Sequence, residues 1–188
     1  MTFSCTNETG LPAAITIIKG EPGSNAVLSS TISAPPLTMT VMRVPKTYTA
    51  YFVTTSADGM THQTATINLP GDSVVVTAKM LAIEPPGTYN IWLETAPGTV
   101  PYQFTMYNEC NTPGTFFLFP TGQSEVSASH MQAAIDAPPA GTVPVNTAET
   151  YTLQAEVDGI TTAPLTVQGC PRISLVREDG GYALKITP

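Results

Sequence analysis

The sequence predicts an all-β fold built from two tandem β-sandwich repeats, immunoglobulin-like or jelly-roll-like. Three observations favour this class. The apolar runs are short and rich in Val, Ile and Thr, turns containing Pro or Gly separate them, and the motif order of the first half returns in the second. Short β-branched runs between turn residues are typical of sandwiches and barrels, and a repeated motif order indicates an internal duplication.

The composition agrees with this class. Of 188 residues, 42% are hydrophobic and 11% are charged, whereas charged residues make up about 25% of an average soluble domain. The 18 prolines and 14 glycines provide the turns that a chain of many short strands needs. The mean hydropathy of +0.09 argues against a disordered chain.

The duplication is visible in matched segments. FSCTNETGLPAAITII, from Phe3, matches FTMYNECNTPGTFFLF, from Phe104, and TISAPPL matches AIDAPPA. ADGMT matches VDGIT, and GTYNIWLETAP in the middle of the chain matches GGYALKITP at its end. We therefore predict one domain over residues 1–97 and a second over residues 98–188, joined at APGTVP. A single larger sandwich woven from both halves is the alternative.

Each element of the first repeat follows from its hydrophobic pattern. Strands are predicted at residues 2–7, 13–19, 37–43, 47–55, 62–69, 73–81 and 88–95, and the second repeat is expected to contain most of them again. The two repeats differ in residues 124–135, where apolar residues at helical spacing follow Ser124. This spacing is consistent with a short helix, and a loop is the alternative.

The closing strand of the first repeat contains Trp92, the only tryptophan. Side chains alternate between the two faces of a strand, so Tyr89, Ile91 and Leu93 are expected to face the core. Trp92 and Asn90 then lie on the outward face, where the repeat alignment places Lys185 opposite Trp92. An outward tryptophan is typical of an interface. We consider two interpretations: an anchor for a partner or glycan, and packing against the other repeat.

Asp58 and Asp158 recur at matching positions, each followed by glycine. Asp-Gly suits the positive φ angles of a type I′ hairpin turn, which is the simpler interpretation. The functional interpretation is a duplicated binding loop to which the hydroxyls of Thr61 and Thr161 contribute.

The three cysteines do not match between repeats, so the repeated unit needs no disulfide. Cys110 and Cys170 both lie in the second repeat and are candidates for one disulfide, which would leave Cys5 for an intermolecular bond. The alternative is three inert thiols. Asn7-Glu8-Thr9 also fits the N-glycosylation pattern.

Charge and motifs exclude several function classes. The net charge is −7 with seven Lys and Arg, so the clustered basic residues that nucleic acid requires are absent, and no run approaches the about 18 apolar residues of a membrane span. We find no motif for nucleophilic catalysis, phosphate or dinucleotide binding, or metal ligation. The sequence predicts a non-enzyme without cofactor or metal.

Three function classes are compared. The duplication, the low charge and the Thr-rich faces favour a structural or interaction protein, a subunit or surface module of an extracellular, virion or cell-surface assembly. Such a protein can be a homo-oligomer. The alternative is a glycan-binding, lectin-like module that uses sandwich loops or Trp92. An enzyme would need a site built across both repeats. The N-terminus lacks the pattern of a signal peptide. The run from Phe104 to Cys110 resembles the opening strand of thaumatin-like proteins, but their many cysteines are absent here, so no residue role is transferred.

Overall fold

The computed structural model describes residues 2–20, 28–123 and 131–187. Across these ranges the protein is all-β, with several sheets and no helix. The strands of the first half are β1 Thr2–Asn7, β2 Ala13–Lys19, β3 Leu28–Ala34, β4 Met39–Arg43, β5 Tyr48–Thr55, β6 Thr61–Gln63, β7 Ile67–Leu69, β8 Ser73–Ile83 and β9 Thr88–Pro97. Those of the second half are β10 Gln103–Asn108, β11 Gly114–Pro120, β12 Ala133–Ala137, β13 Thr142–Asn146, β14 Thr150–Val157, β15 Ile160–Thr161, β16 Leu165–Gln168, β17 Arg172–Glu178 and β18 Gly181–Thr187.

Most predicted strands of the first half are present, with two differences. The strand predicted at 62–69 is divided into β6 and β7, because Thr64 leaves the ladder: its hydroxyl accepts a hydrogen bond from the Phe52 amide (3.0 Å). Strand β3 was not predicted, because Ser and Thr interrupt the apolar alternation in its sequence LSSTISA. In the second half, residues 133–137 form a strand, which rules out a helix there. The remainder of the predicted helix, residues 124–130, lies outside the described residues.

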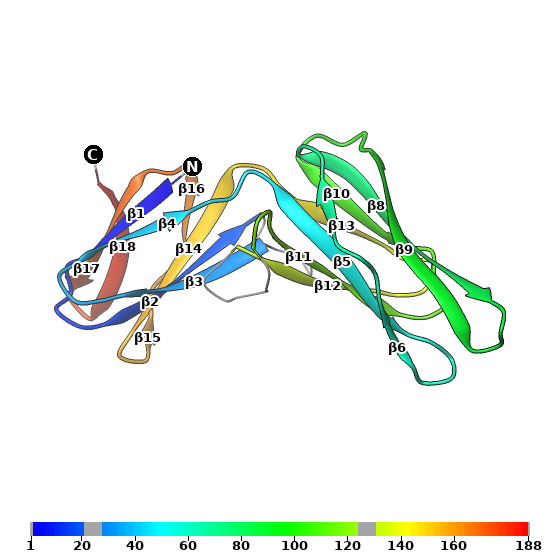
Figure 1. Ribbon diagram of the computed structural model, residues 1–188. Coiled ribbons are helices and arrows are strands. Elements are labelled where there is room, and N and C mark those ends of the chain that lie inside the picture. The colour runs from blue at the N-terminus through cyan, green and yellow to red at the C-terminus, as the bar shows by residue number, and fades with distance from the viewer. Residues whose placement is uncertain (1, 21–27, 124–130, 188) are drawn as a thin grey trace. The chain divides into compact units, whose positions relative to one another are not determined.

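The described chain divides into two compact units, which differ from the predicted domains 1–97 and 98–188. Unit 1 comprises Met1–Lys46, Ser127–Met131 and Glu149–Pro188, and unit 2 comprises Thr47–Val126 and Gln132–Ala148. In Figure 1, unit 1 accordingly combines blue and cyan strands with orange and red ones, whereas unit 2 is cyan to yellow. Each unit thus takes strands from both halves of the sequence.

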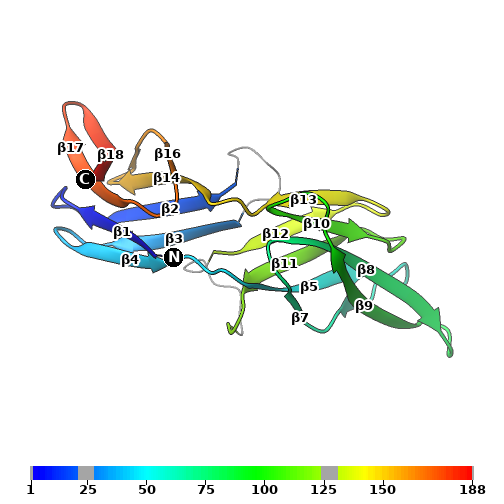
Figure 2. The ribbon, with the colours of Figure 1, turned by 90° about the horizontal axis from the view of Figure 1, so that it is seen from above.

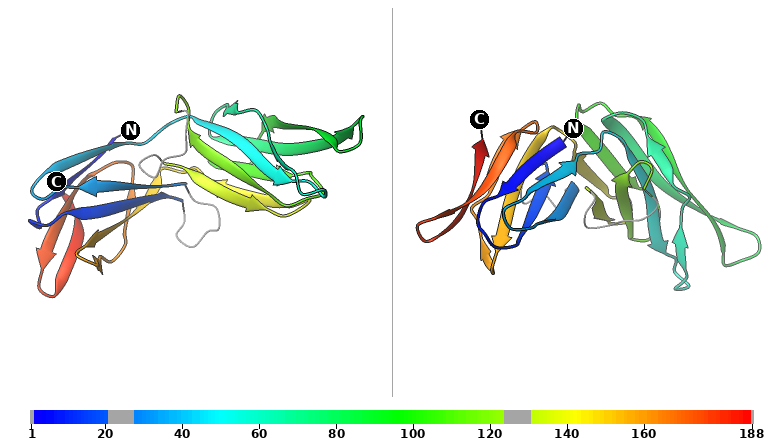
Figure 3. Two further views of the ribbon diagram at one scale, coloured as in Figure 1. Left: turned by 60° about the horizontal axis from the view of Figure 1, so that its bottom comes forward. Right: turned by 60° about the vertical axis from the view of Figure 1, so that its left-hand side comes forward.

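Each unit contains two sheets. In unit 1 the strand orders are β18-β17-β1-β4 and β15-β14-β2-β3, with β16 also paired to β14. In unit 2 they are β13-β10-β8-β9 and β12-β11-β5-β6, with β7 also paired to β5. Figures 2 and 3 show strands from the two ends of the chain side by side in unit 1.

One pairing pattern recurs in both units. The first strand of each half pairs antiparallel with the fourth strand of the same half, β1 with β4 and β10 with β13. On its other side it pairs in parallel with a strand from the opposite half, β1 with β17 and β10 with β8. A parallel pair cannot be closed by a tight turn, and here its two members come from distant parts of the chain.

A phenylalanine and a tyrosine join the two sheets in each unit. Phe3 on β1 packs edge-to-face against Tyr151 on β14, with ring centroids 4.9 Å apart, and Phe104 on β10 packs likewise against Tyr48 on β5 at 5.8 Å. All four side chains are at most 2% exposed. Edge-to-face aromatic pairs of this kind contribute about 0.5–1.5 kcal/mol beyond their buried area, and these two pairs lie between the facing sheets of their units.

Asn7 and Asn108, at the ends of β1 and β10, are fully buried. The Asn7 amide nitrogen donates to the carbonyls of Leu11 and Ala34, both at 2.8 Å, and its oxygen accepts from the Thr9 amide at 3.1 Å. Asn108 repeats this arrangement with the carbonyls of its own loop and of the end of β12: Thr112, Ala137 and Pro138. Each asparagine therefore fixes a turn and ties one sheet of its unit to the other.

Replacing Asn7 with alanine is expected to lower the free energy of unfolding by about 2–4 kcal/mol, because several hydrogen bonds are lost and buried carbonyls are left without a donor. The matched control is Asn90→Ala, which truncates an exposed asparagine and should change stability by less than about 0.5 kcal/mol. Urea denaturation of both variants measures the difference. Equal unfolding midpoints would contradict this role of Asn7.

Unit 2 is almost continuous in sequence, so a fragment of residues 47–148 is expected to fold alone. It retains all strands of both unit 2 sheets, and thermal unfolding followed by circular dichroism should be cooperative. A control fragment of residues 61–148 lacks β5, which pairs with β6, β7 and β11, and should not fold. A non-cooperative transition in the longer fragment would show that unit 2 is not an independent folding unit.

Candidate functional site

The β8–β9 hairpin of unit 2 presents two different faces. On β8, Val74, Val76 and Ala78 are at most 1% exposed and form part of the core. The alternate residues point outward, among them Lys79, which is paired with Trp92 of β9. The outward orientation predicted for Trp92 and Asn90 agrees with this register, because Asn90 pairs with the exposed Leu81.

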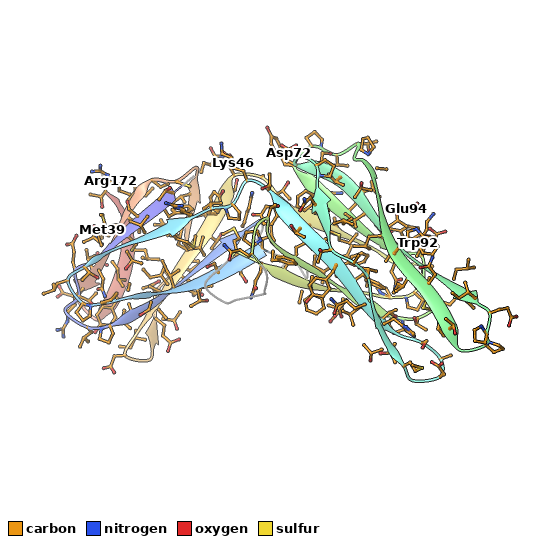
Figure 4. The ribbon with its side chains drawn as sticks, in the orientation of Figure 1. Met39, Lys46, Asp72, Trp92, Glu94 and Arg172 are labelled. Carbon is orange, nitrogen blue, oxygen red and sulfur yellow. The ribbon has the colours of Figure 1, made fainter. Side chains whose placement is uncertain are left out.

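Trp92 belongs to a row of polar contacts across this face. Its indole Nε1 donates to Glu94 Oε1 at 2.9 Å. Lys79 Nζ lies 3.0 Å from Glu94 Oε2 and 3.6 Å from Glu109 Oε2. Figure 4 shows Trp92 and Glu94 together on the same side of β9. We call Trp92, Glu94, Lys79 and Glu109 the tryptophan row; it holds a partly exposed aromatic ring in one orientation.

The electrostatics of the row follow from these contacts. The pKa of Glu94 lies below its ordinary value, because the Trp92 indole N–H, and next the Lys79 ammonium, stabilise the carboxylate. The pKa of Lys79 is raised, mainly by its hydrogen bond to Glu94. Both shifts favour the charged forms at neutral pH.

The matching face of unit 1 lacks this row. In unit 1, Asn7 pairs with Leu175 of β17, which in turn pairs with Leu184 of β18. In unit 2, Asn108 pairs with Ala78 of β8, which in turn pairs with Leu93 of β9. Leu184 and Leu93 therefore occupy equivalent positions. The structural counterpart of Trp92 is therefore Ala183, and not Lys185 as the sequence alignment predicted. The alignment went wrong because the β8–β9 ladder extends further toward its turn than the β17–β18 ladder.

The two Asp-Gly turns lie in different units and differ in form. Asp158 and Gly159 have φ angles of 50° and 75° and connect β14 directly to β15, which agrees with the predicted type I′ turn. Asp58 lies in a longer turn, in which the Ser56 amide donates to the Met60 carbonyl at 2.9 Å. The two Asp-Gly loops therefore differ in backbone form.

The sequence reasoning missed a cluster around Ser56, although Ser56, Asp58 and His62 are close in sequence. The buried Ser56 hydroxyl contacts the Asp58 carboxylate and lies 2.8 Å from His62 Nε2. The His62 ring packs edge-to-face against Tyr89 of β9 at 5.1 Å. The pKa of Asp58 is lowered, mainly by the Ser56 hydrogen bond. Because serine lies between the acid and the histidine, the cluster does not have the order of a catalytic triad, in which histidine lies between the other two. It joins the β5–β6 turn to the β8–β9 hairpin.

The cysteine predictions require correction. Cys5, Cys110 and Cys170 are all free thiols; Cys110 belongs to unit 2 and Cys170 to unit 1, so the Cys110–Cys170 disulfide is not formed. Cys5 is 4% exposed, and burial raises the pKa of its thiol to about 11. A buried thiol with a raised pKa reacts slowly, which argues against an intermolecular bond through Cys5.

The predicted glycosylation pattern also meets an obstacle in the fold. The Asn7 amide nitrogen already donates two hydrogen bonds, of which the one to Ala34 is buried. A glycan attached there would replace one of the two amide hydrogens and so remove at least one of these bonds, which indicates a structural role for Asn7.

A polar groove lies on the outer face of β1, β4, β17 and β18. It has a volume of about 450 Å³ and is lined by Ser4, Thr6, Glu8, Met39, Arg172, Ile173, Ser174 and Thr187; Figure 4 labels Met39 and Arg172. The Ser174 hydroxyl already bonds to Glu8 at 2.8 Å and contacts Thr187 at 2.9 Å. The groove contains no aromatic ring, so it is less suited than the tryptophan row to anchoring a partner.

Comparison with known proteins provides no relative: no family model, no curated protein and no solved structure matches the chain. Within the described ranges, no group of three or more His, Cys, Asp or Glu side chains is placed to hold a metal ion. No helix suited to crossing a membrane occurs among the same residues.

The acid sensitivity of the tryptophan row can be tested. A carboxylate whose pKa is lowered by folding contributes stability above its unfolded pKa and loses that contribution as the pH falls through the folded pKa. Trp92 fluorescence should therefore stay constant from pH 7 to about 4.3, the ordinary value for glutamate, and change only below it.

Glu94→Gln should remove this acid transition, whereas the control Glu109→Gln should retain it, because Glu109 contacts Lys79 and not the indole. A transition that persists unchanged in Glu94→Gln would show that another group controls the environment of Trp92.

Proposed function

We propose that this protein is a non-enzymatic structural or interaction protein, a subunit or surface module of a larger assembly, which acts outside the cell, on a cell surface or in a virion. The observation that carries this proposal is the tryptophan row. A partly exposed tryptophan, held by its indole N–H on the outer face of a long strand, provides a large contact area at little cost in side-chain entropy.

The pairing of strands from the two halves of the chain supports the same proposal. We interpret the two units as β-sandwiches that arose by internal duplication, in which the first four strands of each repeat complete the sandwich of the other. The recurring pairing pattern, the two buried asparagines and the two Phe–Tyr pairs support this interpretation. Strand exchange between repeats of one chain is the intramolecular form of an exchange that also joins separate chains.

A glycan-binding, lectin-like module is the second candidate. It is favoured by Trp92, whose ring could stack on a sugar, with Asn90 and Glu94 on the same face to accept or donate hydrogen bonds. Against it, the corresponding face of unit 1 has Ala183 in place of Trp92, so the two units would not present equivalent sites and would gain no avidity from the repeat.

Size-exclusion chromatography with light scattering distinguishes these functions. We expect an oligomer larger than the 19.8 kDa chain that persists with reductant, because the thiol of Cys5 is buried. Trp92→Ala should weaken association more than Lys185→Ala, which removes a charge from the matching face of unit 1. A monomer that binds an arrayed glycan through Trp92 would favour the lectin-like module instead.

A further inference from the structure

Strand β9 is the longest edge strand in the described part of the chain. It pairs with β8 on one side, and no described strand pairs with its other side. Figure 2 shows it beside β8 at the outside of unit 2. An edge presents unpaired amides and carbonyls, which makes it a template for another strand.

Four other edge strands carry features that discourage pairing, and edge strands β6 and β15 are only three and two residues long. Pro144 interrupts β13, Lys185 lies in β18, Arg43 in β4 and Asp136 in β12. Proline and charged residues on edge strands are the usual protection against edge-to-edge association. The uncharged edge strand β3 is shorter and carries Ser and Thr at most positions. Before its final Pro97, β9 contains no proline and no Lys or Arg, and its one charged residue, Glu94, is held in the tryptophan row.

The hydrogen-bond pattern shows which residues face the open edge. Gly98 N donates to Ser73 O of β8 at 3.0 Å, and backbone groups along a strand point alternately to its two sides. In the unbroken β8–β9 ladder, even-numbered β9 residues therefore bond to β8. The backbone N–H and C=O groups of the odd-numbered residues point away from β8, toward the open edge. These residues are Tyr89, Ile91, Leu93 and Thr95.

We propose that β9 pairs antiparallel with β9 of a second copy of this chain, about a two-fold axis at Trp92. This inference rests on the proposed function as an assembly subunit and specifies the surface that it uses. The two sheets join into one continuous sheet with the order β13-β10-β8-β9 in each copy. Both tryptophan rows then lie on the same face of the joined sheet.

Side-chain chemistry selects this register. Trp92 lies opposite Trp92 of the second copy as a non-hydrogen-bonded pair, in which side chains approach most closely. Asn90 lies opposite Glu94, so an amide meets a carboxylate. The remaining edge positions match Ile91 with Leu93, an apolar pair, and Tyr89 with Thr95, an aromatic residue with a β-branched one. The outward backbone groups of these four residues are all used.

Neighbouring registers are less favourable. An axis at Glu94 places two carboxylates directly opposite each other, which is destabilising. An axis at Leu93 sets Tyr89 against Pro97, which has no N–H to donate. An axis at Ile91 sets Thr95 against Gly87, which lies beyond the end of β9. The axis at Trp92 pairs the outward backbone groups of residues 89 to 95 with one another, avoids like charges, and leaves only Pro97, which has no N–H, opposite a residue outside the strand.

Cysteine cross-linking of the full chain tests the register. Under mild oxidation, Trp92→Cys should form a disulfide-linked dimer, because cysteines at a non-hydrogen-bonded pair have the spacing that a disulfide requires. Asn90→Cys and Glu94→Cys should each fail to link to themselves, but a mixture of the two should form a heterodimer. Wild type and Ala183→Cys, at the matching position in unit 1, are the controls.

A second pair of variants tests the edge without touching Trp92. Thr95 is exposed and its N–H faces away from β8, so Thr95→Pro removes an edge donor while leaving the β8 ladder intact. It should weaken dimerisation by about tenfold or more, since two symmetry-related hydrogen bonds are lost. Thr95→Ala should have little effect. Thermal unfolding of both variants verifies the fold.

The outcomes separate this inference from the proposed function. Association of wild type with neither the Trp92→Cys link nor the link between Asn90→Cys and Glu94→Cys, or with equal affinities for Thr95→Pro and Thr95→Ala, overturns the β9 pairing but leaves the assembly proposal standing. Self-linking of Asn90→Cys or of Glu94→Cys overturns the register. A wild-type chain that stays monomeric at millimolar concentration overturns both proposals.

Discussion

The buried amide of Asn7, like that of Asn108 in the other unit, is the interaction on which its unit depends. The backbone N–H of Asn7 donates to Thr38 O just before β4, and the next amide, of Glu8, donates to Leu175 O of β17, both at 2.9 Å. The side chain meanwhile bonds to the end of β3 in the other sheet. Asn7 and the residue after it therefore fix three strands that come from both halves of the sequence. Because the side-chain bond to Ala34 is buried, losing it leaves a polar group that water cannot reach, which costs far more than losing an exposed bond.

This constraint also explains how the units are composed. The strand that ends at Asn7 is a central strand of its sheet, with β4 of its own half on one side and β17 on the other. Unit 1 cannot close its sheet until the two ends of the chain meet, whereas unit 2 is made from the middle of the chain. Bringing together residues so far apart in sequence costs chain entropy, which the contacts formed afterwards must offset. The packing of Phe3 against Tyr151 contributes part of that stabilisation in unit 1.

The two units share this framework but differ at their surfaces. In unit 2 the longer β8–β9 hairpin carries the tryptophan row and ends in an edge without a basic residue. In unit 1 the matching strand has Ala183 and Lys185, and Lys185 pairs with Glu178. We interpret this asymmetry as a division of roles, in which unit 2 offers the surface for association and the edge of unit 1 is protected by charge.

The sequence by itself determined the all-β class, most of the strands of the first half and the outward orientation of Trp92 and Asn90. These features depend on local alternation and turn chemistry, which the order of residues expresses directly. The tertiary structure decided what depends on contacts between distant residues. It placed the unit boundaries near 46 and 148, replaced Lys185 by Ala183 as the counterpart of Trp92, buried Asn7 and Cys5, and gathered Ser56, Asp58 and His62. A repeated motif order does not show whether each half of the sequence pairs its strands only with one another or also with strands of the other half. The local sequence pattern is the same in both cases. The pairing of β1 with β17 and of β10 with β8 distinguishes them.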